Sequence, residues 1–125
     1  MVSTDRIADM WTDASDDYDR IVSRELRNPR DVYYWRHELD TRLGDEPRDV
    51  LDVGCGPGFF SIMLSRLGHR VTSLDASEGM LRAARRNLTW YGIEPHVRHS
   101  DVVTLDDVAD SSVDAVVSRD VVWTL

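Results

Sequence analysis

The chain has 125 residues, of which 42% are hydrophobic and 30% are charged, a balance typical of one globular domain with one core. Its net charge is -8 and all 15 basic residues are arginines, so a nucleic-acid partner, which requires a basic surface, is not expected. No apolar run approaches the roughly 18 residues of a membrane span, the N-terminus lacks an apolar signal core, and the single Cys55 cannot form an internal disulfide. We therefore expect a cytoplasmic protein that binds neither nucleic acid nor membrane.

Two helices are predicted ahead of the first strand. In residues 5–22 apolar side chains recur at helical spacing along one stripe. The stripe comprises Ile7, Met10, Trp11, Ala14, Tyr18, Ile21 and Val22. Asn28 before Pro29 is typical of a second helix N-terminus, and Gly44 is expected to end that helix. Its stripe comprises Val32, Trp35, Leu39 and Leu43. Residues 1–47 are therefore predicted to form an N-terminal helical cap.

Strands and helices alternate from residue 49 onward. The predicted strands cover residues 49–54, 70–75, 95–101 and 113–120. The predicted helices cover residues 57–68 and, after the cap Ser77, the stretch that Gly92 stops. Residues 104–110 are read as a short helical turn or loop, and residues 121–125 are left without an element. This alternation predicts an α/β fold with a parallel sheet and helices on both faces, whose ligands bind beyond the carboxyl ends of the strands.

The stretch VLDVGCGPGFF, residues 50–60, places three glycines at alternate positions directly after a strand. Gly54, Gly56 and Gly58 remove side chains where the backbone has to pass close to a ligand. A dinucleotide fingerprint would need its third glycine at position 59, which is Phe59, and no Gly-Lys-Ser/Thr follows to make a phosphate loop. The alternative is a tight turn between strand and helix with no ligand.

Two aspartates follow the next two strands. Asp75 lies about 20 residues beyond the first glycine, where an acidic residue accepts both hydroxyls of a ribose. Its alternative role is that of a cap at the N-terminus of a helix. Asp101 is placed to accept the exocyclic amine of an adenine, with the Val102 N–H serving a ring nitrogen; its alternative is a solvated turn aspartate.

The sequence resembles the class I S-adenosylmethionine-dependent methyltransferases. VLDVGCGPG is similar to their first motif, VTSLDAS to the second, HSDV to the third and VDAVVSRDVVWTL to the fourth, in the family's order and spacing over roughly residues 48–125. The upstream MWTDASDDYD is similar to a W-D-x-x-A-x-x-Y-D segment of many small-molecule members. The closest branch resembles the quinone-biosynthesis methyltransferases.

The resemblance implies S-adenosylmethionine as cofactor, bound by a Rossmann-like half-domain over residues 48–125. The glycine loop would approach the methionine part of the cofactor, and Asp52 would lie near the positive end of that part. The backbone at Ser118 and Arg119 would form the floor under the sulfonium. The implied cofactor-binding residues are Asp52, Gly54, Cys55, Gly56, Gly58, Asp75, Ala76, Asp101, Val102, Ser118, Arg119 and Tyr18. Because the family fold has seven strands, this chain would be truncated after the fourth. Within the cap, Trp11 and Tyr18 would shield the pocket, whereas Trp35 is expected to pack in the core.

Methyl transfer from a sulfonium is an in-line displacement that runs on positioning and desolvation, so no protein nucleophile is required. Asp120 is the candidate that would orient or deprotonate an acceptor, with an exposed cap as its alternative. Cys55 is expected to fill space rather than to react. His96 and His99 lie on opposite sides of a strand with no ligand set around them, so no metal is expected.

Three hypotheses remain at this point. The first is the cofactor-binding half of a methyltransferase whose acceptor is a small molecule. The second is a non-catalytic S-adenosylmethionine-binding module or regulatory subunit. The third, a nicotinamide enzyme, conflicts with the glycine spacing. The fourth strand is expected to leave an apolar hydrogen-bonding edge, which would favour a homodimer or pairing with a missing C-terminal half.

Overall fold

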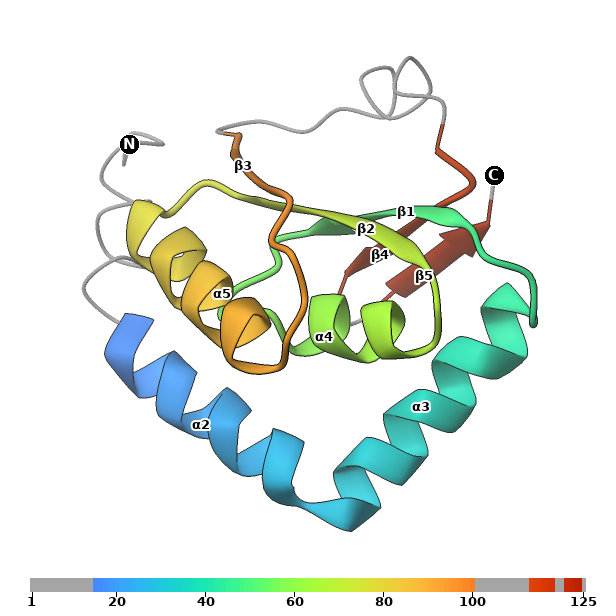
Figure 1. The fold of residues 1–125 in the computed structure, drawn as a ribbon, viewed down its shortest axis with the longest axis horizontal. Coiled ribbons are helices and arrows are strands. Elements are labelled where there is room, and N and C mark those ends of the chain that lie inside the picture. Colours follow the sequence, from blue (N-terminus) through green and yellow to red (C-terminus); the bar gives the residue numbers. More distant parts are fainter. Residues whose placement is uncertain (1–14, 101–112, 119–120, 125) are drawn as a thin grey trace.

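A computed structural model describes residues 15–100, 113–118 and 121–124 (Figure 1). Two helices come first, followed by alternating strands and helices. The elements are α2 (Ser15–Arg27), α3 (Pro29–Leu43), β1 (Asp49–Val53), α4 (Phe59–Arg66), β2 (Arg70–Asp75), α5 (Glu78–Trp90), β3 (Val97–His99), β4 (Ala115–Ser118) and β5 (Val121–Thr124). None of these described helices is long and apolar enough to cross a membrane.

The strands form one sheet in the order β3-β2-β1-β4-β5. The pairs β1–β2, β1–β4 and β2–β3 are parallel, as the alternation of strands and helices predicts. β1 therefore lies inside the sheet, with Val50 opposite Val71 on one side and Ala115 on the other. The carboxyl ends of these four strands meet at one edge, which is where the glycine loop begins (Figure 1).

The prediction that β4 has an open edge is wrong. β5 pairs with β4 in antiparallel register, with Val117 opposite Val122 and Ser118 opposite Val121. Only two residues separate these strands along the chain, and a connection that short can join only antiparallel neighbours. Residues 121–124, for which the sequence predicts no element, therefore pair with the edge of β4 that the sequence predicts to be open, and the predicted pairing with a second chain stays a prediction.

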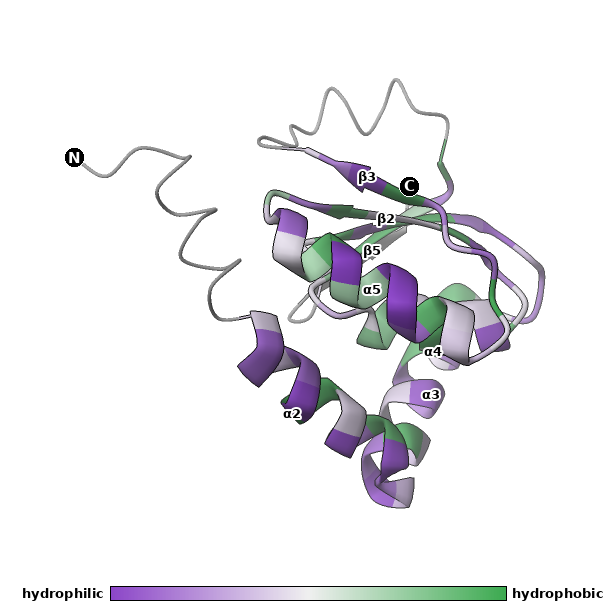
Figure 2. Ribbon diagram, turned by 60° about the vertical axis from the view of Figure 1, so that its left-hand side comes forward, coloured by the Kyte–Doolittle hydropathy of each residue, from purple (hydrophilic) through white to green (hydrophobic). Residues whose placement is uncertain are grey.

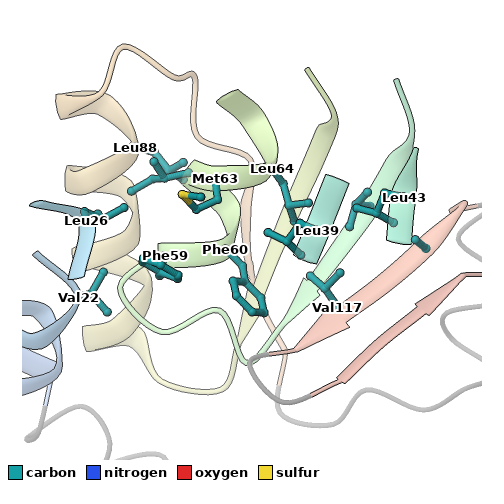
Figure 3. Close-up of a cluster of buried hydrophobic side chains, with 13 residues drawn as sticks. Val22, Leu26, Leu39, Leu43, Phe59, Phe60, Met63, Leu64, Leu88 and Val117 are labelled. Atoms are coloured by element: carbon teal, nitrogen blue, oxygen red, sulfur yellow. The ribbon is translucent and has the colours of Figure 1, made fainter. Parts of the chain in front are cut away.

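The helices of the described residues lie together on one side of the sheet (Figures 1 and 2). The main core fills the space between them and the sheet (Figure 3). It comprises Val22, Leu26, Leu39, Leu43, Val50, Phe59, Phe60, Ile62, Met63, Leu64, Leu88, Ala115 and Val117. On the other face, Leu51, Leu74 and Val116 form a smaller buried cluster. Residues 104–110, where a helical turn had been predicted, lie outside the described part of the chain.

The N-terminal helices contribute directly to this core. Leu39 and Leu43 of α3 are fully buried, and Trp35 meets Phe60 edge to face with ring centroids 5.2 Å apart, so the core role expected for Trp35 is confirmed. The side chain of Asn28 accepts hydrogen bonds from the first turn of α3, and Gly44 ends the helix with a φ of 78°, both as predicted.

The stripe predicted for α2 needs a correction. Val22 and Leu26, one turn apart, form its buried face, whereas Tyr18 is 39% exposed and Ile21 is 51% exposed. Ile21 lies about 100° around the helix axis from Val22, outside the face that Val22 and Leu26 bury. The division into a cap over residues 1–47 and a cofactor-binding half-domain over residues 48–125 stays a prediction. In the structure, α2 and α3 share one hydrophobic core with the sheet.

A buried histidine makes stability depend on pH. Nδ1 of His69 accepts the Arg48 N–H at 3.1 Å, and among the described residues Nε2 has no partner. Burial, followed by the charge of Arg48, lowers the pKa of His69. The unfolded chain therefore binds this proton first as the pH falls below about 6.5, and stability drops by at most about 1.4 kcal/mol per pH unit.

We expect His69→Asn, whose amide oxygen can take over the bond from Arg48, to lose less stability than the wild type between pH 7 and pH 5. Urea unfolding at several pH values measures this difference. Parallel stability curves for the two proteins would show that His69 does not titrate between the folded and unfolded states.

Candidate functional site

The glycine loop leaves β1 and enters α4 through three glycines with positive φ. The angles are 66° at Gly54, 54° at Gly56 and 99° at Gly58, values that other residues adopt only with strain. Among the described residues, a Cβ at Gly54 or Gly56 would meet nothing within 4 Å, so these two positions face open space in that part of the chain. A Cβ at Gly58 would instead lie 3.6 Å from Ala84 of α5, so this glycine allows close packing between loop and helix.

Backbone hydrogen bonds fix the shape of this loop. The Cys55 N–H donates to the carbonyl of Leu74 on β2 at 2.9 Å, and the Gly58 N–H donates to the Cys55 carbonyl at 3.1 Å. α4 then begins at Phe59 without a side-chain cap on its first turn. The loop is thus a rigid turn whose outer side is lined by glycine rather than by side chains, which leaves room for a ligand against the backbone.

Asp75 connects the glycine loop to the start of α5. Its Oδ2 accepts the Gly56 N–H and its Oδ1 accepts the Ser77 N–H, both at 2.9 Å. The cap of α5 is Ser77 itself, whose Oγ accepts the Met80 N–H at 3.3 Å, so Asp75 is not needed as the cap. An ionised carboxylate has about four acceptor positions, so both oxygens can also accept from hydroxyls of a ligand.

Three buried polar side chains lie under the loop, on the helix-covered side of the sheet. Ser61 of α4 donates to Oδ2 of Asp52 at 2.7 Å, and its Oγ lies 2.6 Å from the Oγ of Ser73 on β2. All three residues are at most 2% exposed. The carboxylate predicted to face the cofactor therefore also holds α4 against β1 and β2. Serines within the apolar stretches FFSIML and VTSL are the only signal in the sequence that could have pointed to this network.

Cys55 is a packing residue in this loop. It is buried against Leu81 and Ala84 of α5. Burial raises the pKa of the Cys55 thiol far above its usual range, and the nearby carboxylates of Asp52 and Asp75 raise it further. The thiol is therefore protonated at neutral pH and is no nucleophile, in agreement with the space-filling role expected from the sequence.

The rim of the site contains a contact that the sequence did not reveal. A ring nitrogen of His99, Nε2, lies 3.0 Å from the carbonyl oxygen of Ala76, and the Ser100 N–H donates to the Asp75 carbonyl at 3.0 Å. These bonds attach the end of β3 to the segment that follows β2. Within the described ranges no three His, Cys, Asp or Glu side chains are grouped as metal ligands.

The remaining predicted site residues divide into two groups. Ser118 ends β4 and is half-buried, and Tyr18 lies on α2 with 39% of its surface exposed. The others, Trp11, Asp101, Val102, Arg119 and Asp120, lie outside the described residues, so their predicted roles stay predictions. What the structure brings together is the glycine loop, Asp75 with Ala76, and the buried Asp52.

Comparison with known proteins points to one family. A profile of the methyltransferase domain matches residues 50–125. The ubiquinone biosynthesis O-methyltransferase of Ruegeria pomeroyi is 37% identical over 89 residues, which cover 68% of this chain and 36% of that enzyme. The chain spans about half or less of the length of the curated relatives it matches.

Solved structures share the arrangement of sheet and helices. A candidate S-adenosylmethionine-dependent methyltransferase from Methanococcus maripaludis has a TM-score of 0.60 at 20% identity, covering 74% of this chain and 42% of that one. Coclaurine N-methyltransferase bound to N-methylheliamine and S-adenosylhomocysteine has a TM-score of 0.57 at 16% identity, covering 71% of this chain and 26% of that one. At these identities the likeness establishes the Rossmann-like fold alone.

Proposed function

Because the chain belongs to the methyltransferase domain family, we propose that it supplies the S-adenosylmethionine-binding half of an enzyme that methylates a small molecule. The observation that carries this proposal is the open space beside Gly54 and Gly56 among the described residues. Both glycines follow β1, at the edge of the sheet where the carboxyl ends of the parallel strands lie. Asp75 lies beside that space and bonds to Gly56. A backbone-lined surface next to a carboxylate suits a cofactor that carries a ribose and a positive charge.

The residues of this chain would bind and orient rather than react. S-adenosylmethionine supplies an electrophilic methyl group on a positive sulfur. Asp75 would accept the ribose hydroxyls, while the loop at Gly54 and Gly56 would let the backbone approach the methionine part. The buried Asp52, which is held by Ser61 of α4, would add negative charge beneath that part. Binding and orienting the cofactor in this way requires no protein nucleophile, which agrees with the raised pKa of the buried Cys55 thiol.

The acceptor is proposed from the relatives. Ubiquinone biosynthesis O-methyltransferase names an oxygen acceptor, so we propose a hydroxyl group of a small molecule as the site of methylation. Asp120 remains the candidate to orient or deprotonate that hydroxyl. The longer relatives contain residues beyond the matched region, and we propose that an equivalent segment, or a second copy of this chain, completes the acceptor wall in the cytoplasm.

Calorimetry and a transfer assay test the proposal together. We expect the chain to bind S-adenosylmethionine and S-adenosylhomocysteine but not NADH, because the glycine spacing differs from the dinucleotide pattern. Labelled methyl transfer to phenolic acceptors should then appear in the full-length protein. Binding without transfer to any acceptor would support the second hypothesis, a non-catalytic module, and an absence of S-adenosylhomocysteine binding would contradict the proposal itself.

A further inference from the structure

One side-chain network joins the N-terminal helix to the glycine loop through α5. Nδ2 of Asn87 donates to Oδ1 of Asp19 at 2.7 Å and to the carbonyl oxygen of Pro57 at 2.9 Å. Arg86 forms an ion pair with the other oxygen of the Asp19 carboxylate. Asp19 is separated from Asn87 by 68 positions in the sequence, so the contact depends on the folded arrangement of α2 and α5. We call these four residues, Asp19, Pro57, Arg86 and Asn87, the α2 latch.

Both hydrogens of the Asn87 amide are used in the α2 latch. A primary amide has two donor hydrogens, and here one points to α2 while the other points to the loop. The Asp19 carboxylate is likewise held at both oxygens, with its side chain 19% exposed. A shift of α2 therefore changes the position of Asn87, and with it one of the two bonds that the amide makes.

The loop end of the α2 latch lies inside the glycine stretch. Pro57 stands between Gly56 and Gly58, and its carbonyl belongs to the same peptide plane as the Gly58 N–H. That N–H donates to Cys55, and Gly58 packs against Ala84 of α5. The bond from Asn87 to Pro57 therefore fixes the orientation of a peptide next to the open surface at Gly56.

We infer that Asp19 and Asn87 are positioning residues through which docking of α2 and cofactor binding at the glycine loop favour each other. This inference rests on the proposed function. Coupling of this kind is reciprocal: if a docked α2 improves the loop for the cofactor, the bound cofactor strengthens docking of α2 by the same factor. Asp19 is the last residue of the stretch MWTDASDDYD. The inference gives it a function, because Asn87 of α5 connects it to Pro57 in the glycine loop.

A purely structural role makes a different prediction. The α2 latch would then contribute to the free energy of unfolding alone, and the folded fraction of a variant would bind the cofactor as the wild type does. The exchange of α2 amide hydrogens with solvent separates the two cases. A bound ligand slows exchange through global unfolding at every amide, so coupling is shown by a slowing in α2 that exceeds the slowing in the strands.

The test uses Asn87→Ala and Asp19→Ala in the full chain, with S-adenosylhomocysteine as the probe; each variant removes one partner of the bond between Asp19 and Asn87. We expect calorimetry to show affinities about tenfold lower than in the wild type. In the wild type, S-adenosylhomocysteine should slow hydrogen exchange in residues 15–27 more than in the strands, and in both variants this additional protection should be lost. The double variant should bind no more weakly than the weaker single variant, because both changes break one link.

Asp17→Ala is the matched control, since Asp17 lies on the same helix and pairs only loosely with Arg20, both side chains being 78% exposed. It should leave affinity and protection unchanged; an equal loss there would overturn the inference in favour of a general charge effect. Unchanged affinity and protection in both latch variants would also overturn it. If Asn87→Ala does not fold, Asp19→Ala decides alone, because the Asp19 side chain reaches the surface. A wild type that does not bind S-adenosylhomocysteine would instead contradict the proposed function.

Discussion

Replacing Gly56 with valine is expected to abolish binding of S-adenosylhomocysteine while the far-ultraviolet circular dichroism spectrum stays that of the wild type. Gly56 has a φ of 54°, and its missing side chain faces open space beside Asp75. A branched side chain there would occupy the space proposed for the cofactor and would resist the left-handed backbone. We expect the affinity to fall by at least a hundredfold, which corresponds to about 2.7 kcal/mol.

Gly92→Val is the matched control for backbone strain. Gly92 also has a positive φ, 75°, and a Cβ there would meet no described residue within 4 Å, but Gly92 follows the C-terminus of α5, whereas the glycine loop precedes α4. Both variants should lose about 1–2 kcal/mol of stability from the left-handed conformation, and only Gly56→Val should lose binding. If Gly56→Val keeps both its fold and its affinity, the loop is a turn without a ligand.

The second large effect is expected for Asp75→Ala, which should lower the affinity for S-adenosylhomocysteine at least tenfold. A charge-assisted pair of hydrogen bonds to a ribose contributes about 1.5–3 kcal/mol. The variant also removes the acceptors of the Gly56 and Ser77 N–H groups, so a lower melting temperature is expected as well. Calorimetry well below the melting temperature separates the loss of affinity from the loss of stability.

Ser77→Ala provides the control for that second effect. It removes the hydroxyl that caps α5 through the Met80 N–H and should cost about 1 kcal/mol of stability. Its affinity for S-adenosylhomocysteine should stay that of the wild type. An unchanged affinity in Asp75→Ala would mean that this carboxylate only accepts hydrogen bonds from the Gly56 and Ser77 N–H groups, and it would contradict the proposed contact with the ribose.

Local signals in the sequence predicted much of the fold. The boundaries of β2 and the caps Asn28 and Ser77 agree with the structure, because each depends on residues within one turn or one strand. α4 is shorter than predicted, covering 59–66 in place of 57–68. The left-handed Gly58 delays its start, and Gly68 with a φ of 97° lies beyond its end.

Features that depend on distant partners could not be predicted in this way. A four-residue apolar stretch becomes β5 only because β4 lies next to it. The same holds for Ser61 with Asp52, for His69 with Arg48, and for the α2 latch, whose members come from three separate elements. The pairing of the glycine loop with Asp75 could be expected from the sequence because both belong to one motif whose spacing spans about 20 residues, and ligand binding there stays a prediction.

The position of β1 in the sheet has a consequence for synthesis at the ribosome. β1 leaves the exit tunnel before all of its neighbours; β2 follows about 21 residues later, but β4, which covers its other side, follows only after about 65. At translation rates of roughly 5–20 residues per second, that side of β1 stays without a partner for about 2–9 s after β2 has emerged. The nascent chain thus carries an open strand edge at what becomes the centre of the finished sheet, and during this interval that edge is available for pairing with another nascent chain.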